Sequence, residues 1–274
     1  MIRKSVCVLL TCFNRCNKTI NCVTTLTSSN PDIQFEFVIV DDKSSDGTVE
    51  CLRRLTDYNI HILEGTGNLY YSGGMRKAIA YAKETISDAE YYLLVNDDVS
   101  FYEKSIQEIL TYCNGNIVVG MTDDGNNKIT YGGVISCNKF RPSLRVTAPE
   151  HGKVLHADTF NANCVLIPAR VFANLDNIDS HYVHGFGDYD YGFEARRKGI
   201  DIIVPDIFVG MCKRNSNTNT WHDTNLSLKK RISLKEKPNG SPTKMWFYFT
   251  RKNYGIASAI FVVVYQYVKL FLGK

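Results

Sequence analysis

Several familiar signatures are missing from this 274-residue sequence. Its nine cysteines contain no Cys-x-x-Cys pair, so the spacing typical of zinc sites and dithiol redox centres is absent. Their number is odd, and the first residues lack a secretory-signal pattern. Together these features predict free thiols in a reducing cytosol, where most of them behave as small buried apolar groups.

The glycine fingerprint of a dinucleotide-binding fold is also missing. The loop expected after the first strand, TCFNRCNK, contains no glycine, and G-x-G-x-x-G does not occur there. This argues against a nicotinamide or flavin dinucleotide as cofactor. It also argues against a nucleotidyltransferase, for which we expect a phosphate loop rich in Gly and in Arg or Lys at this place.

Acidic residues are scarce near the C-terminus. Residues 205–274 carry 12 Lys or Arg and 3 Asp or Glu, whereas the other 204 residues carry 20 and 25. The net charge of +4 therefore hides a basic end that we expect to face an anionic partner. The body is acidic and holds no nucleic-acid-binding motif, so nucleic acid is not the expected partner.

The first hundred residues alternate short apolar runs with amphipathic segments. Buried strands are predicted at residues 5–10, 35–40, 60–63 and 91–95, with helices near 15–29, 48–55 and 75–86. This order is typical of right-handed βαβ units in a parallel sheet, which binds ligands at the carboxyl ends of its strands. Later residues predict a helix at 101–113, strands at 117–121, 129–135 and 160–168, a turn at 123–126, and a helix from Asp188 to Gly199.

Each of the four strands ends in polar or glycine-rich residues. The apolar run of residues 91–95 leads into Asn96-Asp97-Asp98, where two adjacent carboxylates repel each other unless a cation lies close. We therefore predict a metal-binding strand end, with a simple turn or helix cap as the alternative. Gly73 and Gly74 are expected to let the backbone approach a ligand, or to open the helix that follows.

Four stretches occur in the order FVIVDDKSSDGT, GNLYYSGGMRKAIAYA, YYLLVNDDVS and FGDYDYGFEARRKGI. Together they resemble a bacterial family 2 glycosyltransferase of the GT-A fold, of the rhamnosyltransferase-like type, over roughly residues 4–215. The resemblance implies an α/β fold: a Rossmann-like, mostly parallel sheet flanked by helices. Residues 1–215 would form the nucleotide-sugar-binding and catalytic domain, and residues 216–274 a basic, aromatic and helical C-terminal extension that contacts the acceptor or a membrane surface.

The resemblance also implies an activity and a set of site residues. It predicts a metal-dependent, inverting hexosyltransferase that takes a dTDP-, UDP- or GDP-linked sugar and uses Mg²⁺ or Mn²⁺. Asp98 matches the metal-binding position, and Asp188 or Asp190 matches the catalytic base. The implied donor-binding residues are Thr11, Asn14, Arg15, Asp41, Asp42, Gly73, Gly74, Asn96 and Asp97. The acceptor would be a saccharide or a polyprenyl-diphosphate-linked molecule in bacterial surface polysaccharide assembly.

The residue types suit this chemistry. Breaking a sugar–phosphate bond leaves negative charge on the diphosphate, which a divalent cation stabilises. An acceptor hydroxyl needs a carboxylate to remove its proton, and inversion requires that base on the face opposite the leaving group. The metal carboxylate and the base should therefore lie on separate elements, as Asp98 and Asp188 do in the predicted fold.

Two positions depart from the family pattern. Gly187 stands where a Glu usually precedes Asp188, and Met211-Cys212 follows Pro205-Asp206 where many relatives have a His. These departures support an alternative function, a non-catalytic sugar-nucleotide-binding or scaffold protein with a degenerate site.

The last apolar segment, residues 256–272, is broken by Gln266 and Lys269 and is shorter than the roughly 20 apolar residues of a membrane-spanning helix. Aromatic residues beside Lys and Arg are typical of a helix that lies in a membrane interface. We therefore expect a cytoplasmic protein that docks on the inner face of the cell membrane. The alternative is a helix that packs on the catalytic domain or on a second subunit.

Overall fold

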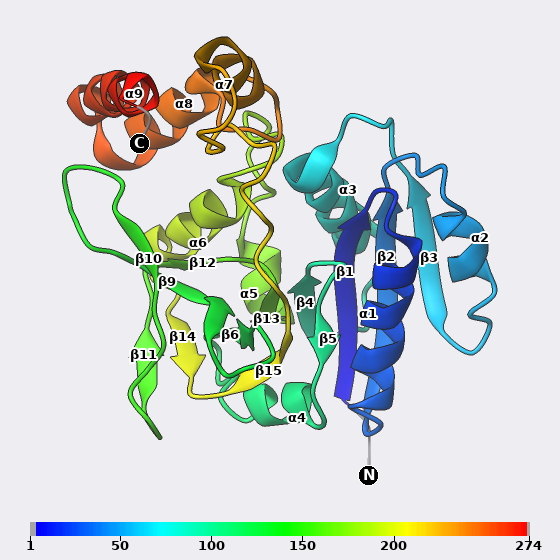
Figure 1. The fold of residues 1–274 in the computed structure, drawn as a ribbon. Coiled ribbons are helices and arrows are strands. Elements are labelled where there is room, and N and C mark those ends of the chain that lie inside the picture. The colour runs from blue at the N-terminus through cyan, green and yellow to red at the C-terminus, as the bar shows by residue number, and fades with distance from the viewer. Residues whose placement is uncertain (1–3, 273–274) are drawn as a thin grey trace.

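The first part of the chain alternates strands and helices as the sequence predicts. A computed structural model describes residues 4–272 (Figure 1). The elements in this part are β1 (Lys4–Cys12), α1 (Cys16–Ser28), β2 (Ile33–Asp41), α2 (Thr48–Arg53), β3 (Asn59–Glu64), α3 (Tyr70–Thr85) and β4 (Tyr91–Val95). Every predicted strand and helix before residue 96 is confirmed, with its ends shifted by a few residues.

The main sheet has eight strands in the order β11-β14-β6-β13-β4-β1-β2-β3. Its later strands are β6 (Ile117–Val119), β11 (Val154–His156), β13 (Cys164–Pro168) and β14 (Ile202–Pro205). Strands β1, β2, β3 and β4 are parallel neighbours, and Cys12 pairs with Asp41, which pairs with Glu64. Their carboxyl ends therefore meet at one edge, as parallel pairing requires. Strand β13 runs antiparallel to β4 and β6, and β11 to β14.

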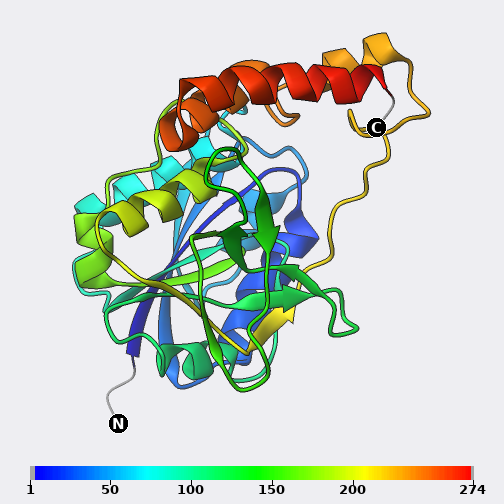
Figure 2. The same ribbon diagram turned by 90° about the vertical axis from the view of Figure 1, so that its left-hand side faces the viewer.

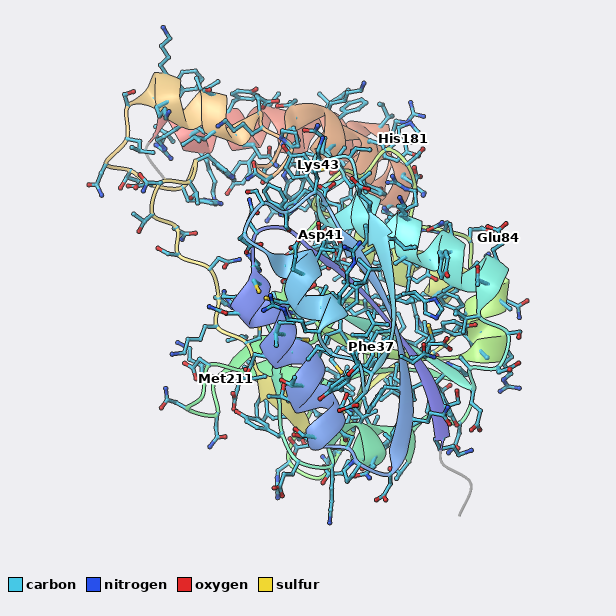
Figure 3. All side chains as sticks on the ribbon, turned by 90° about the vertical axis from the view of Figure 1, so that its right-hand side faces the viewer. Phe37, Asp41, Lys43, Glu84, His181 and Met211 are labelled. Carbon is cyan, nitrogen blue, oxygen red and sulfur yellow. The ribbon has the colours of Figure 1, made fainter. Side chains whose placement is uncertain are left out.

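Helices cover both faces of this sheet. Within β1, Cys7 and Leu9 belong to the core on the face of the sheet that α3, α5 (Ala169–Asn174) and α6 (Gly187–Arg197) cover, whereas Val8 and Leu10 belong to the core on the face of α1, α2 and α4 (Ser105–Leu110). Successive side chains of a strand point to opposite faces, so a strand buried on both faces is apolar throughout. This is why the sequences of these strands are continuous apolar runs. Figure 3 shows Phe37 in the body of β2 and Asp41 at its carboxyl end.

Two small sheets complete the domain. They are β10-β9-β12 and β5-β15-β7-β8, built from β5 (Ser100–Phe101), β7 (Met121–Asp123), β8 (Ile129–Tyr131), β9 (Gly133–Ser136), β10 (Leu144–Val146), β12 (Thr159–Phe160) and β15 (Phe208–Met211).

The extents predicted after residue 100 are wrong for four segments. The helix expected at 101–113 covers only α4, because Ser100 and Phe101 pair with β15. The strands expected at 117–121 and 129–135 are each interrupted at a glycine, where the chain passes from one sheet to another. The strand expected at 160–168 is likewise divided, into β12 and β13.

Three helices follow the domain: α7 (Leu228–Lys235), α8 (Thr243–Tyr254) and α9 (Ile256–Phe271). Figures 1 and 2 show them together on the side of the molecule toward which β1 and β2 point. Helix α8 packs on the domain through Phe249 and Met245, which contact Tyr182 and the aromatic rings of Phe186 and Phe193. No helix within residues 4–272 is long and apolar enough to cross a bilayer.

Candidate active site

A cavity of about 640 Å³ opens at the carboxyl edge of β1, β2 and β4. Nineteen residues line it, and they come from the strand ends, the glycine-rich loop, the start of α6 and the C-terminal extension. The predicted residues among them are Thr11, Arg15, Asp42, Asn96, Asp97, Asp98 and Asp188. The fold therefore brings together most of the residues that the sequence marks at separate strand ends.

The two adjacent carboxylates are neutralised by cations of the protein itself. Nη1 of Arg15 lies 3.1 Å from a carboxylate oxygen of Asp97 and 3.1 Å from one of Asp98. Nζ of Lys18 lies 3.9 Å from Asp98. Burial nevertheless raises the pKa of Asp97 to about 6, although Arg15 acts in the opposite direction. The predicted repulsion is thus balanced by α1, whose first residues follow Arg15 directly.

The residues at this strand end fit a divalent cation. Asp98 has one oxygen that accepts a hydrogen bond from the Cys212 thiol at 3.3 Å, and its side chain is 12% exposed. Nearby, Oδ1 of Asn96 is buried and has no hydrogen-bond partner among residues 4–272. Carboxylate and amide oxygens are the ligands that Mg²⁺ and Mn²⁺ prefer. The described residues contain no group of three His, Cys, Asp or Glu side chains placed to hold a metal, and Mg²⁺ often needs only one or two carboxylates plus substrate phosphates.

Asp188 lies in the first turn of α6 and lines the cavity. Its carboxylate accepts hydrogen bonds from the backbone N–H groups of Tyr189 at 2.9 Å and Ala162 at 3.4 Å. Burial outweighs these hydrogen bonds and raises its pKa to about 6. The group is therefore ionised at neutral pH and holds its proton more strongly than an exposed Asp, as a general base must.

Asp190 lies outside the cavity. Its carboxylate accepts from Nζ of Lys252 at 2.6 Å and from Nδ2 of Asn253 at 3.1 Å, and both partners belong to α8. The side chain is 3% exposed. Of the two carboxylates that the sequence leaves as candidates for the base, only Asp188 faces the space in which a substrate fits.

Close packing explains why a glycine stands at residue 187. The starts of α3 and α6 meet here, because Ser72 donates from its backbone N–H to Val183 and from Oγ to the carbonyl of His184. A Cβ atom at residue 187 would lie 2.5 Å from Oγ of Ser72 and 3.0 Å from Cγ2 of Ile178. Any larger residue would push the two helix ends apart, so the glycine keeps Asp188 in place.

Four predicted donor-binding residues do not line the cavity: Asn14, Asp41, Gly73 and Gly74. Oδ1 of Asn14 accepts from the backbone of Ser45 at 2.7 Å and joins two strand-end loops. Asp41 is 2% exposed and accepts from the backbone of Ser44 at 2.8 Å.

Both glycines belong to the body of α3. A Cβ atom at Gly74 would lie 2.1 Å from Oγ1 of Thr11, and one at Gly73 would lie 3.2 Å from Cβ of Leu69. Gly74 therefore allows the close approach of α3 to β1, in place of the expected approach to a ligand.

Asp42 holds the backbone of the glycine-rich loop through hydrogen bonds. Its carboxylate accepts from the backbone N–H groups of Gly67 at 2.7 Å, Leu69 at 2.8 Å and Tyr70 at 3.0 Å. Tyr70 has a positive φ of 53°, as do Asn14, Lys43 and Phe186 in neighbouring loops, with φ between 50° and 67°. Left-handed non-glycine residues are strained and concentrate at binding sites. Of these four residues, Tyr70 lines the cavity itself.

Several cavity residues were not predicted. Phe13 has a ring that is 51% exposed at the cavity, and Tyr131, His184, Asn215 and Asn239 line it from distant parts of the chain. Asn161 and Asn163 also line it; they precede β13, so they carry the same signal of polar residues beside a buried strand that identified the other loops. No sequence pattern predicts Asn239, because its place at the cavity depends on how the C-terminal extension folds back.

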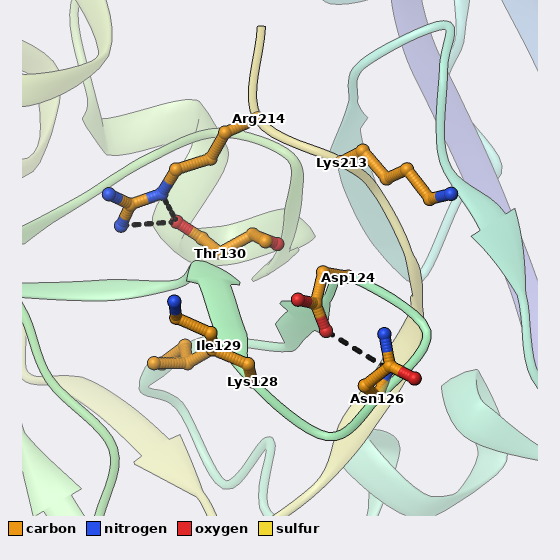
Figure 4. Close-up of a pocket in the computed structure, with 7 residues that line it drawn as sticks. All are labelled: Asp124, Asn126, Lys128, Ile129, Thr130, Lys213 and Arg214. Carbon is orange, nitrogen blue, oxygen red and sulfur yellow. Dashed lines mark hydrogen bonds between the residues drawn. The ribbon is translucent and has the colours of Figure 1, made fainter. Parts of the chain in front are cut away.

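A second hollow of about 510 Å³ lies on the other side of β8 (Figure 4). The guanidinium of Arg214 donates to the carbonyl of Thr130 at 3.0 and 3.1 Å, which fixes the chain that leaves β15 against β8. The turn predicted at residues 123–126 is confirmed, since Asp123 and Asp124 accept hydrogen bonds from the backbone of Gly125 and Asn126. Asp123 also accepts from the hydroxyl of Tyr102 at 2.8 Å, so both carboxylates have partners within the protein.

Comparison with known families decides the class of protein. The family model described as glycosyl transferase family 2 matches residues 7–156, which is more than half of the chain. The chain belongs to glycosyl transferase family 2. The chain is also similar to the low-salt glycan biosynthesis hexosyltransferase Agl10 of Haloferax volcanii, with 26% identity over 180 residues. That match covers 61% of this chain and 55% of the relative, so the chain spans about half the length of the curated relative it matches.

Solved glycosyltransferases share the fold. The mannosyltransferase PcManGT from Pyrobaculum calidifontis, in complex with GDP-Man and Mn²⁺, matches 95% of this chain and 74% of its own, with a TM-score of 0.57 and 12% identity. S. aureus TarS 1–349 matches 91% of this chain and 73% of its own, with a TM-score of 0.55 and 14% identity. GalNAc-T7 with UDP, GalNAc and Mn²⁺ matches 85% and 48%, with a TM-score of 0.59 and 10% identity. The predicted α/β GT-A class is confirmed.

Proposed function

We propose that this chain is an inverting, metal-dependent glycosyltransferase that moves a hexose from a nucleoside-diphosphate donor to an acceptor hydroxyl. The observation that carries the proposal is the cavity itself. It holds Asp98 and the unpartnered amide oxygen of Asn96 at one strand end, and Asp188 on a different element. A cation site and a separate base are the two groups that inverting sugar transfer needs.

The donor would be a dTDP-, UDP- or GDP-linked sugar. PcManGT was solved with GDP-Man, and TarS with UDP-GlcNAc and with UDP, which supports a nucleotide sugar here. Thr11, Arg15 and Asp42 line the part of the cavity nearest β1 and β2, where Phe13 offers an exposed ring for stacking on a base. The loops and α3 around this part of the cavity would be held in place by predicted residues that do not line it, namely Asn14, Asp41, Gly73 and Gly74.

The diphosphate would lie beside Asp97 and Asp98, where Arg15 and Lys18 supply positive charge. The N-termini of α3 and α6 meet at the same cavity, and their dipoles favour an anion. Mg²⁺ or Mn²⁺ bound by Asp98 and Asn96 would stabilise the charge that develops on the leaving diphosphate.

Asp188 would act as the base. Its carboxylate accepts the acceptor's hydroxyl proton while the acceptor oxygen forms a bond to the anomeric carbon. The bond between that carbon and the phosphate oxygen breaks at the same time, and its electron pair leaves with the diphosphate. A single displacement of this kind inverts the configuration, with the base on the side opposite the leaving group.

We also propose a setting for this activity. Residues 1–215 form the catalytic domain, and residues 216–274 form an extension that contacts the acceptor or a membrane surface. The acceptor is a saccharide or a polyprenyl-diphosphate-linked molecule at the inner face of the cell membrane, in surface polysaccharide assembly, with a rhamnosyltransferase-like specificity. The relative's role in glycan biosynthesis supports this setting.

The test is release of nucleoside diphosphate from each donor class with Mn²⁺ or with EDTA. Asp188→Asn should slow release by roughly 10²- to 10⁴-fold, while Asp190→Asn, the matched control two residues away, should retain it. A protein that binds the donor but never turns it over would support the non-catalytic alternative. The packing reason for Gly187 removes one of the two departures that favoured that alternative.

A further inference from the structure

Helix α9 exposes a continuous apolar face. Its exposed large side chains are Ile256, Ile260, Phe261, Val264, Tyr265, Val268 and Phe271, with between 42% and 64% of each exposed. These residues share one side of the helix, while Ala259, Val262, Gln266 and Leu270 are buried on the other. An apolar stripe this long normally faces a partner.

The orientation of this face is fixed by buried polar contacts beneath it. Lys235 in α7 is fully buried, and its Nζ donates to Glu236, to the carbonyl of Ser241 and to Thr243 at 2.9–3.0 Å. Nη1 of Arg231 donates to the carbonyl of Leu270 at 3.3 Å near the end of α9. The bond from Arg231 joins α7 to α9, and the Tyr267 hydroxyl of α9 donates to Glu236 at 3.0 Å, so polar contacts with α7 and the residue after it set which side of α9 is exposed.

Figure 2 shows α9 running along the top of the molecule, above the main sheet. A second segment contacts the helix: Ser258, in the first turn of α9, donates to the carbonyl of Phe140, whose side chain is 81% exposed. The loop between β9 and β10, which carries this exposed aromatic residue, is therefore held against the first turn of α9.

Positive charge accompanies the apolar face. Residues 221–272 contain nine Lys or Arg and only two Asp or Glu. Glu236 is engaged with Lys235 and Thr243, and Asp223 accepts from backbone N–H groups. The exposed cations Lys229, Lys230, Lys237, Lys244, Arg251 and Lys269 form no ion pair within residues 4–272.

We propose that α9 binds the surface of an anionic lipid bilayer, with its apolar side chains among the acyl chains and the cations on the headgroups. A second copy of the chain would bring two basic surfaces together, which is unfavourable, whereas an anionic bilayer complements both the apolar face and the charge. The inference rests on the proposed function, because a lipid-linked acceptor is what gives membrane docking its purpose.

The test is sedimentation of the full chain with vesicles of phosphatidylcholine alone and of phosphatidylcholine with phosphatidylglycerol. The wild type should sediment with the anionic vesicles and lose most of that binding in 0.5 M NaCl. Phe261→Ser/Phe271→Ser should reduce the bound fraction about tenfold or more, since each loses several buried apolar carbons. Val154→Ser, an exposed apolar residue on β11, is the matched control and should bind as the wild type does.

Two results would overturn the proposal. One is a wild type that stays in the supernatant with anionic vesicles. The other is a concentration-dependent dimer, seen by light scattering, that the double substitution dissociates, because α9 would then face a second copy. Donor binding to the same variants, measured in solution, separates this proposal from the catalytic one: loss of vesicle binding with intact donor binding leaves the proposed function untouched.

Discussion

Nζ of Lys252 lies 2.6 Å from Oδ2 of Asp190, and this ion pair joins α8 to α6. Asp179 accepts from the same ammonium group at 2.8 Å. Residues two apart on a helix face different directions, so the pair with Lys252 turns Asp188 toward the cavity. One short acidic motif thus serves two purposes: Asp190 holds the C-terminal extension, and Asp188 lines the site.

Asp190→Asn should therefore affect mainly stability, and Asp188→Asn mainly catalysis. The first leaves Lys252 with a weakened partner in a largely buried contact and should lower the free energy of unfolding by about 2 kcal/mol. The second should lower kcat by roughly 10²- to 10⁴-fold, the usual contribution of a general base, and leave the melting temperature nearly unchanged. Thermal melting and a donor-turnover assay on both variants measure this. Equal loss of stability in the two variants would contradict the assignment.

Activity should fall in acid. The base works only when deprotonated, and burial raises the pKa of Asp188 to about 6. Its neighbours Tyr71 and Tyr189 are neutral in this range, because burial raises the pKa of both phenols. We expect kcat/KM to decrease about tenfold per pH unit below pH 6 and to level off above pH 7. A profile that is flat between pH 5 and 7, measured with a donor-saturation control at each pH, would place the base elsewhere.

Arg15 should restrain metal binding when no donor is present. Its guanidinium bridges Asp97 and Asp98, so a cation approaching Asp98 meets a positive charge already in place. Arg15→Ala should tighten donor-free Mn²⁺ binding by roughly tenfold, because removing one nearby like charge at a partly exposed site is worth on the order of 1 kcal/mol. Titration of Mn²⁺ followed by electron paramagnetic resonance reads this directly. Lys43→Ala, an exposed cation in a neighbouring loop, should have no effect.

Gly187→Ala should destabilise the protein by about 1–3 kcal/mol, the usual cost of overpacking. The added carbon would lie 2.5 Å from Oγ of Ser72, so the double variant Gly187→Ala/Ser72→Gly should recover part of the loss. The control is Gly185→Ala, where the nearest atom to a new Cβ is Cε of Met245 at 3.9 Å. Urea unfolding measures the free energy of unfolding of the three variants. A loss in Gly187→Ala that the double variant partly recovers would show that packing, and not a degenerate active site, explains the glycine at residue 187.

The sequence predicts the parallel half of the sheet well, because strands buried on both faces read as apolar runs and their ends as polar loops. The same pattern marks Asp98 at a strand end, whereas the assignment of Asp188 comes from the resemblance to the glycosyltransferase family. The sequence does not separate Asp188 from Asp190, since the partner of Asp190 lies 62 residues away in α8. It also assigns Gly73, Gly74 and Asn14 to the ligand, although the first two serve helix packing and Asn14 joins two loops. Contacts between segments that are distant along the chain leave no pattern in the local sequence.

The most direct test of the central claim is donor binding by thermal shift, with UDP-, GDP- and dTDP-linked sugars, in Mn²⁺ and in EDTA. We predict that one nucleotide class raises the melting temperature by several degrees at about 100 times its Kd, only when Mn²⁺ or Mg²⁺ is present. Asp98→Asn should remove the metal dependence and most of the shift. Stabilisation that is the same in EDTA, or absent with all three classes, would contradict the proposed site.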